Sequence, residues 1–290
     1  MLNGIIVGSV IAIGALSVTL IYGLLRIVNF AQGDYITFGA YVALVINVTW
    51  SRSLFEAVIG AALMTALLAV AFEFALWRPL RRRRTSFIAF FVPSVGLALI
   101  LRNAISLIAG SEFRIYEWDQ LAVYELFDLR FSAAQVITIA TGVAVVTAMG
   151  LMLARTSLGR AMRAVSDDAT LASIAGVNVN RLIVYTWVLS GMLAGVAGVL
   201  QGLLQNSFDP NIGFNMLLPI FAAVILGGLG SAYGALAGGL TLGVVMETST
   251  WAALPGGGVD PTYKVAVAFG AMILVLLIRP NGVFGHLRQT

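Results

Sequence analysis

The sequence predicts an all-α polytopic membrane protein with about eight or nine transmembrane helices, some of them discontinuous at glycine-rich segments. Sixty per cent of the 290 residues are hydrophobic, only 10% are charged, and the mean hydropathy is +0.97. Soluble chains have about 45–50% apolar and 25% charged residues, so this chain has too little charge to cover a water-facing surface. Several uncharged runs reach the roughly 20 residues that a helix needs to cross the hydrocarbon core.

The order of these runs defines the expected helices. Candidate spans cover residues 3–25, 35–51, 54–77, 85–109, 131–154, 182–208, 210–246 and 264–278. The run 210–246 is too long for one crossing. Its middle, GGLGSAYGALAGG at 227–239, predicts a break into two shorter crossings or half-helices, because glycine accepts positive φ and weakens a helix by about 1 kcal/mol per residue. We expect residues 1–290 to form one transmembrane domain.

Charged clusters between the runs predict the orientation. The segment 78–84 holds five arginines in seven residues, which the positive-inside rule places in the cytoplasm. The mostly acidic connection 110–132 suits the outside, and the basic loop 155–181 returns inside. Alternation then places segments 206–213 and 254–263 outside, and the glycine turn near residue 230 and the C-terminus inside. The same parity gives a non-cytoplasmic N-terminus and about nine crossings, or about eight if residues 27–36 form a re-entrant break. The first run is expected to be a retained span, since no basic residue precedes it.

Polar residues interrupt the apolar pattern at RIVNFAQGDY, residues 26–35. Non-helical backbone at membrane depth persists only where protein or a water-filled cavity satisfies its N–H and C=O groups. One glycine-interrupted helix in each half of a chain is typical of a substrate route through a transporter, and the two breaks here lie near residues 33 and 230. The alternative is that Asn29 and Asp34 are ordinary interfacial caps on a short loop.

Other features favour structural roles. Four Gly-x-x-x-Gly pairs, which begin at residues 4, 191, 234 and 239, indicate close packing between helices, and they favour contacts inside the chain over a dimer seam. Glu73 is expected near the cytoplasmic interface because Arg78 follows it. Glu247 is the better functional candidate, since an ionisable group in an apolar run is a suspect by default. The candidate pathway residues are Asn29, Gln32, Asp34, Gly227, Gly228, Gly230 and Glu247.

Several classes of protein are excluded by what the sequence lacks. There is no cysteine, so disulfides and thiolate metal sites are absent. The only lysine, Lys264, follows DPTY, so no G-x-x-x-x-G-K-[ST] phosphate loop exists. The only histidine, His286, leaves no Ser-His-Asp arrangement and supplies no metal site. The basic clusters match topology signals and not a nucleic-acid patch. We therefore expect transport, with no catalytic residue, metal or bound cofactor in this chain.

The polar stretch SLGRAMRAVSDDATLASIAGVNVNR, residues 157–181, predicts a short helix within the basic loop. The SDD at 166–168 gives a capped start with acidic groups at the positive end of the helix dipole, and Gly176 gives an αL stop. Leu171, Ile174 and Ala175 would share one face. A two-turn helix is marginal alone, so it needs a partner surface. A groove in a soluble protein and the lipid headgroups fit this helix equally well on composition.

Four segments in order resemble the permeases of the branched-chain amino acid ABC importer family. They are IVNFAQGDYITFGAY (27–41), the stretch 157–200 that begins with the polar segment above, AAVILGGLGSAYGALAGG (222–239) and IRPNGVFG (278–285). The resemblance spans nearly the whole chain and is specific to the family, but much less specific to its substrate. Family members often have His where this chain has Gln32, so a titratable role at this position is excluded.

The resemblance implies a bacterial inner-membrane permease that works with a second permease subunit, two ATP-binding subunits and an extracytoplasmic substrate-binding protein. Residues 169–178 would form the coupling helix that meets an ATP-binding subunit, and ATP and Mg would bind there and not to this chain. The implied coupling residues are Arg160, Arg163, Asp167, Asp168, Leu171, Ile174 and Gly176. Alternating access would carry a zwitterionic amino acid with an apolar side chain past the residues near the two breaks.

Other functions remain open at this point. A stand-alone secondary carrier or channel would use Asp34 or Glu247 for ion coupling, but it would have no use for a coupling helix. A membrane-embedded scaffold would leave the paired breaks unexplained. Urea, short amides and aromatic acids are alternative solutes for an ABC permease, because selectivity largely resides in the binding protein.

Overall fold

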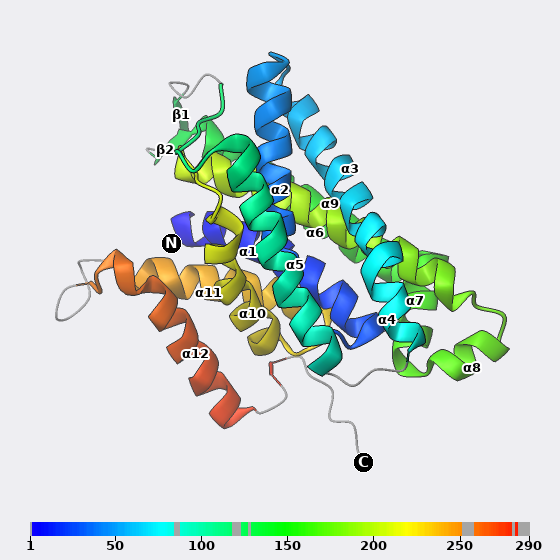
Figure 1. Ribbon diagram of the computed structural model, residues 1–290. Coiled ribbons are helices and arrows are strands. Elements are labelled where there is room, and N and C mark those ends of the chain that lie inside the picture. The colour runs from blue at the N-terminus through cyan, green and yellow to red at the C-terminus, as the bar shows by residue number, and fades with distance from the viewer. Residues whose placement is uncertain are drawn as a thin grey trace.

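The computed structural model describes residues 2–83, 88–117, 123–126, 129–250, 258–279 and 282–283. Nine longer helices run through this part of the chain (Figure 1): α1 (Leu2–Leu25), α2 (Gln32–Leu44), α3 (Leu54–Phe72), α5 (Ile88–Ala109), α6 (Ala133–Arg155), α9 (Val179–Gln205), α10 (Ile212–Gly227), α11 (Ala232–Ser249) and α12 (Lys264–Ile278). The shorter helical elements are η1 (Val45–Thr49), η2 (Glu73–Trp77), α4 (Arg78–Arg82), α7 (Ser157–Asp167), α8 (Ala169–Ile174) and η3 (Pro261–Tyr263).

Six of these segments are long and apolar enough to cross a membrane. They are Asn3–Leu25, Leu54–Arg82, Phe90–Ala109, Ala133–Arg155, Val179–Gln205 and Pro261–Ile278, and the shorter apolar helix α10 adds to them. The predicted all-α, multi-pass class is confirmed. One element was not expected: strands β1 (Val123–Leu126) and β2 (Leu129–Ser132) pair antiparallel in the connection that was expected to be a loop.

Side-chain caps fix where several helices begin. Ser53, Asn178 and Ser231 accept hydrogen bonds from backbone amides in the first turns of α3, α9 and α11. Ser132 and Gln135 form a capping box at the start of α6. Such caps satisfy amides that have no partner within the helix, so each apolar run starts at a defined residue.

The centre of the molecule is α1, and 89% of its apolar window is buried. It packs antiparallel to α11 through two glycine pairs. A Cβ added at Gly243 would overlap the backbone of Gly8, and one added at Gly239 would overlap Ala12, while Gly4 lies against Val244. Small residues let helix backbones approach this closely. Gly191 and Gly195 likewise lie against α3, and Gly234 and Gly238 against α10. The prediction of internal glycine packing is therefore confirmed.

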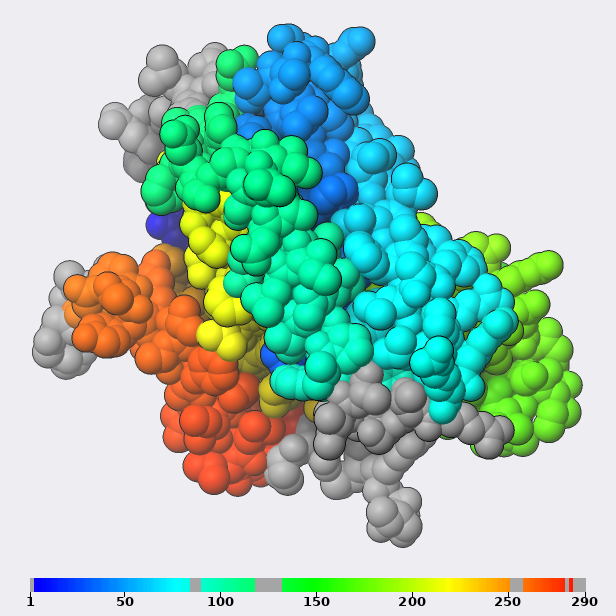
Figure 2. Space-filling model, in the orientation of Figure 1, coloured from blue at the N-terminus to red at the C-terminus, as the bar shows by residue number. Residues whose placement is uncertain are grey.

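The helices α5, α6 and α12 surround this centre and expose most of their apolar windows, of which 28%, 22% and 6% are buried. Figure 2 shows α5 across the front of the molecule and α12 standing beside the main body. Their outward apolar faces suit contact with lipid or with another membrane subunit.

One end of the helix bundle, called here the arginine-rich end, contains α4, α7 and α8. Ser166 of α7 donates a hydrogen bond of 2.8 Å to the carbonyl of Gly23 near the end of α1. Gly230 lies against Gly23, and the Tyr233 hydroxyl lies 3.3 Å from the carbonyl oxygen of Gly150 in α6. The three segments predicted to share one side of the membrane, 78–84, 155–181 and the turn near residue 230, therefore lie at one end. Arg84 lies outside the described residues.

The opposite end collects the segments of the other predicted side. Arg114 and Phe208 form a β-bridge that joins the connections after α5 and α9. The Tyr116 hydroxyl donates to the carbonyl of Ala40 over 2.9 Å, and burial raises the pKa of this phenol well above its usual value, so it stays neutral. Gln135 donates to Asn3 at the start of α1. The N-terminus therefore lies at the end predicted for it.

Candidate functional site

The candidate pathway begins where α1 ends and the chain turns back into the protein. Arg26 has φ of 55°, a conformation that ends a helix. The side-chain oxygen of Asn29 then accepts the amide of Ala31 over 3.2 Å, and α2 begins at Gln32. Ile27, Asn29 and Ala31 are buried. Asn29 is thus buried, and its side chain caps the turn at the start of α2 from within the protein.

Gln32 joins three helices through a buried polar network. Its amide nitrogen lies 3.0 Å from the Ser17 hydroxyl of α1 and 3.1 Å from the Ser190 hydroxyl of α9, and its oxygen accepts from Asn29 over 3.2 Å. Ser190 also donates to the carbonyl of Ser17 over 2.9 Å. Ser17 lies eight residues before the end of α1, so α2 starts about 12 Å below that end. The break is re-entrant, yet α2 still continues to the opposite end of the protein.

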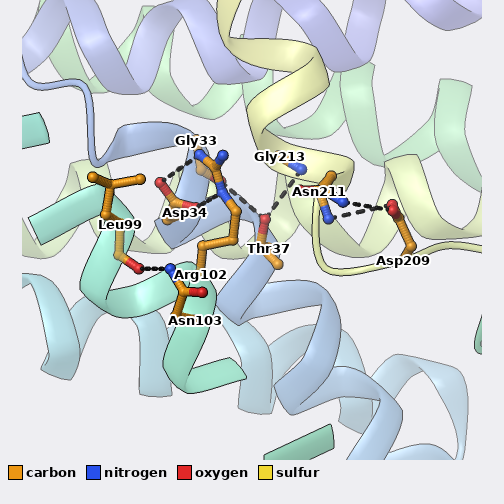
Figure 3. A network of polar contacts seen from close by, with 9 residues as sticks. All are labelled: Gly33, Asp34, Thr37, Leu99, Arg102, Asn103, Asp209, Asn211 and Gly213. Atoms are coloured by element: carbon orange, nitrogen blue, oxygen red, sulfur yellow. Dashed lines mark hydrogen bonds and ion pairs between the residues drawn. The ribbon is translucent and has the colours of Figure 1, made fainter. Parts of the chain in front are cut away.

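Asp34 forms an ion pair with Arg102 inside the protein (Figure 3). Arg102 Nε lies 3.0 Å from Oδ1 and Nη2 lies 3.4 Å from Oδ2, and the Asp34 side chain is only 1% exposed. The guanidinium also stacks over the Phe214 ring at 4.0 Å. Asp34 is on α2, Arg102 on α5 and Phe214 on α10, so the pair connects three helices. A paired charge is the form in which ionisable side chains persist within a membrane protein.

The starts of α2 and α10 meet beside this pair. A Cβ added at Gly213 would overlap the carbonyl of Gly33, and one added at Gly33 would overlap that of Gly213. The Gly213 amide donates to the Thr37 hydroxyl over 3.1 Å (Figure 3). Two helix N-termini, each with the partial positive charge of its dipole, therefore face the region around Asp34 and Arg102.

The second predicted break lies elsewhere. Gly228 and Gly230 have φ of 104° and 86°, which only glycine adopts easily, and Gly227 packs directly on Gly234. This turn separates α10 from α11 as predicted. It lies at the arginine-rich end against Gly23, about two turns along α1 from the level of Ser17. The two breaks are thus linked by α1 and do not form one cluster.

The structure does not bring Glu247 to the other candidates. Its carboxylate pairs with Lys264 Nζ at 2.5 Å, where α11 ends and α12 begins. Glu73, in contrast, lies at the arginine-rich end as expected, where Arg81 holds its buried carboxylate. Both glutamates therefore have a cationic partner.

The predicted short helix is present as α8. Asp168 caps it by accepting the amides of Thr170 and Leu171 at 2.7 and 3.0 Å, and Gly176 ends it with φ of 89°. Leu171 and Ile174 are 64% and 80% exposed. Figure 1 shows α8 at the margin of the molecule, beyond α7.

The residues around α8 support it from α7. Arg163 donates to the carbonyl of Leu153 and Arg160 to that of Arg155, so both arginines cap the end of α6. Asp167 is the last residue of α7, and Met162 and Val165 bury the inner face of that helix. The two arginines therefore have a structural role besides any contact with a partner.

Sequence reasoning missed Arg102, Ser17, Ser190, Thr37 and Phe214. Arg102 was the only charge in the run 85–109, which was a usable signal, because an isolated charge in a span needs a buried partner. Nothing in the sequence marked the two serines. Within the described residues, no three His, Cys, Asp or Glu side chains gather as a metal site, and His286 lies outside them.

The chain is similar over nearly its whole length to known transport permeases. Residues 1–276 match the family described as the permease component of branched-chain amino acid transport systems. The chain is 33% identical over 307 residues to the high-affinity branched-chain amino acid transport system permease protein LivH of Salmonella typhimurium, with 99% of this chain and 94% of the relative covered. It is 30% identical over 309 residues to the corresponding protein BraD of Pseudomonas aeruginosa, with coverage of 99% and 95%.

Solved structures share the fold. PsaBC from Streptococcus pneumoniae in complex with Fab gives a TM-score of 0.53 at 16% identity, with 96% of this chain and 91% of that chain covered. A metal-chelate type ABC transporter in an inward-facing conformation gives 0.51 at 16% identity, with 96% and 85% covered. The family match and the full-length likeness to these relatives show that this chain belongs to the family of branched-chain amino acid transport system permease components.

Proposed function

We propose that this chain is a permease subunit of an ABC importer that moves branched-chain or other hydrophobic amino acids across the bacterial inner membrane. ATP hydrolysis on two partner subunits would drive the movement, and a second permease and an extracytoplasmic binding protein would complete the transporter. The chain itself would bind no cofactor and perform no catalysis. The arginine-rich end would face the cytoplasm together with the C-terminus, which lies outside the described residues.

The observation that carries this proposal is the exposed apolar pair on α8. Leu171 and Ile174 project from a short, capped helix at the margin of the arginine-rich end. A six-residue helix is not stable alone, and the side chains of Leu171 and Ile174 make little contact with the rest of this chain. The helix is nevertheless held by its cap, so we expect its apolar pair to insert into a partner. An ATP-binding subunit is the partner that the family's function requires at this end.

A chain of contacts leads from α8 to the predicted pathway. Through Ser166, α7 bonds to Gly23 of α1, and Ser17 of α1 bonds to Gln32 at the start of α2. Movement of α8 would therefore reach the re-entrant break through the central helix. This linkage supports alternating access, in which a rigid element has two discrete positions.

The buried site at the start of α2 suits a zwitterion. The Asp34 carboxylate and the Arg102 guanidinium offer one group of each sign, and the N-termini of α2 and α10 add positive potential for a carboxylate. The Phe214 ring, the Thr37 hydroxyl and the close backbone contact of Gly33 and Gly213 surround the pair. The pathway role of Asn29, Gln32 and Asp34 is part of this proposal, with Gly227, Gly228 and Gly230 as a hinge.

A stand-alone carrier has less support, because it would have no use for the exposed apolar pair on α8, and Glu247 is paired with Lys264 away from the other candidates. Reconstitution distinguishes the two functions. The purified chain alone in proteoliposomes should move no leucine, whereas the complex with the second permease, the ATP-binding subunits and the binding protein should accumulate leucine when ATP is supplied. Uptake by the chain alone, driven by a proton or sodium gradient, would establish the carrier. Competition with isoleucine, valine, urea and short amides would identify the solute.

A further inference from the structure

Two adjoining pockets at the arginine-rich end have no role in the proposed transport pathway. The first has a volume of about 350 Å³ and is lined by Glu73, Phe74, Arg78, Asn180, Arg181, Val184 and Tyr185. The second has a volume of about 420 Å³ and is lined by Phe74, Arg78, Pro79, Arg82 and Arg83. Phe74 and Arg78 line both, so the two pockets form one continuous surface, called here the arginine groove.

The groove lies at the boundary of two membrane spans. One wall is the last part of the span Leu54–Arg82, and the other is the first part of the span Val179–Gln205. Arg78 and Arg181 lie at the outer level of the groove. Tyr185 lies four residues nearer the centre of its α-helical span, which is about 6 Å deeper. Phe74 also lies four residues nearer the centre of its span, within the π-helix η2. Both walls therefore present an arginine above an exposed aromatic ring.

The charge of the groove is positive. Arg78, Arg82, Arg83 and Arg181 line it, and Arg82, Arg83 and Arg181 are exposed. The one acid in its lining is Glu73, which is neutralised by Arg81 with Nη1 at 2.9 Å from Oε2. The Arg78 guanidinium lies 5.3 Å from the centre of the Phe74 ring, so it is held over the apolar part of the groove.

We propose that the arginine groove binds an anionic phospholipid. The arginines bind the phosphate, since a guanidinium fork matches phosphate geometry, and the acyl chains run inward along Phe74, Val184 and Tyr185. On both walls the arginine matches the position of a lipid headgroup, and the aromatic ring matches the position of the acyl chains. A phospholipid needs this order, whereas a soluble anion does not. This inference does not depend on the identity of the transported solute.

Native mass spectrometry of the purified full-length chain tests the proposal. The probes are dioleoyl phosphatidylglycerol, dioleoyl phosphatidylethanolamine and inorganic phosphate. The phosphatidylglycerol should be retained more strongly than the phosphatidylethanolamine, and excess inorganic phosphate should not displace it. The double variant Arg78→Gln with Arg181→Gln should bind phosphatidylglycerol about 30-fold more weakly, as expected for two arginines at an anionic lipid surface.

Matched variants keep the result interpretable. Arg155→Gln removes an exposed arginine at the same end but outside the groove, and it should retain the lipid. The double variant Arg78→Lys with Arg181→Lys keeps the charge but loses the guanidinium fork, so its affinity for phosphatidylglycerol should lie between those of the unsubstituted chain and the glutamine variant. It keeps the test informative if the glutamine variant folds poorly. Equal retention of both lipids, an unchanged affinity in the glutamine variant, or displacement by inorganic phosphate would overturn the proposal. In a separate co-purification with the partner subunits, it would also be overturned if the glutamine variant kept the lipid but lost the ATP-binding subunits, because the groove would then be a protein contact.

Discussion

Arg102 on α5 and Asp34 on α2 form an ion pair inside the protein, with Nε 3.0 Å from Oδ1. The Arg102 guanidinium also stacks over the Phe214 ring of α10. Removal of one partner of such a pair leaves an uncompensated charge, which costs about 3–5 kcal/mol, whereas removal of both costs much less. The pair can therefore be tested by substituting each residue alone and both together, because the double variant should lose less stability than either single variant.

Asp34→Asn and Arg102→Gln should each lower ATP-driven leucine uptake strongly without disturbing assembly with the partner subunits. The double variant should recover thermal stability but not uptake, because stability needs only charge balance whereas a zwitterion needs both charges. Initial uptake rates and melting curves in detergent measure the two effects. If the single variants transport with unchanged kinetics, the pair is a structural clamp alone.

Leu171→Asp and Ile174→Asp should each abolish ATP-driven uptake while the protein still inserts into the membrane. An unpaired carboxylate buried in an apolar contact costs several kcal/mol, which weakens binding more than about 100-fold. Co-purification of the ATP-binding subunits measures the contact directly. Ser173→Asp changes an exposed residue on another face of α8 and should leave the complex intact. Uptake at the unsubstituted rate by either aspartate variant would exclude this docking face.

Ser166→Ala should separate ATP hydrolysis from transport. It removes the hydrogen bond to Gly23, worth about 0.5–1.5 kcal/mol, and so loosens the contact between α7 and the central helix. The amount of leucine moved per ATP hydrolysed should fall several-fold, while Ser166→Thr, which keeps the hydroxyl, should restore the ratio. A constant ratio in the alanine variant would show that the signal travels by another route.

Gly198→Val should destabilise the protein, because a side chain there would overlap the backbone of Ile36 and Ala40 in α2. Overpacking of this kind costs about 1–3 kcal/mol. Gly96→Ala is the matched control, since no atom lies within 4 Å of the position of its added Cβ. Melting temperatures in one detergent should therefore fall for the first variant, and stay the same or rise slightly for the second, because alanine stabilises a helix relative to glycine. Equal melting temperatures for both would contradict the close contact of α2 and α9.

The helices could be predicted from sequence because their signals are local. Apolar runs, the arginine cluster at 78–84 and the capped stretch 166–176 each fix an element without reference to the rest of the chain. The alternation of the charged connections between the two sides of the membrane likewise predicted which segments meet at each end of the protein. The split of the run 210–246 followed from its glycines, whose φ values at 228 and 230 are those that other residues avoid.

The site was less predictable because its contacts join distant parts of the chain. Asp34 and Gln32 were visible as polar residues in an apolar setting, but their partners Arg102 and Ser190 lie 68 and 158 residues away. Glu247 was suspected for the same reason as Asp34, and only the structure showed that Lys264 accounts for it. A polar residue in a membrane span thus reveals that a partner exists, but not where it comes from.

The glycine contact between α1 and α11 also bears on how the protein is made. The ribosome synthesises α11 more than 200 residues after α1, so the helix that ends up at the centre enters the bilayer long before its main neighbour exists. Until then the smooth glycine surface of α1 faces lipid or the insertion machinery. The central contact is therefore completed only when residues 232–249 have been synthesised, and a ribosome stalled before residue 232 leaves a product that quality-control proteases should remove.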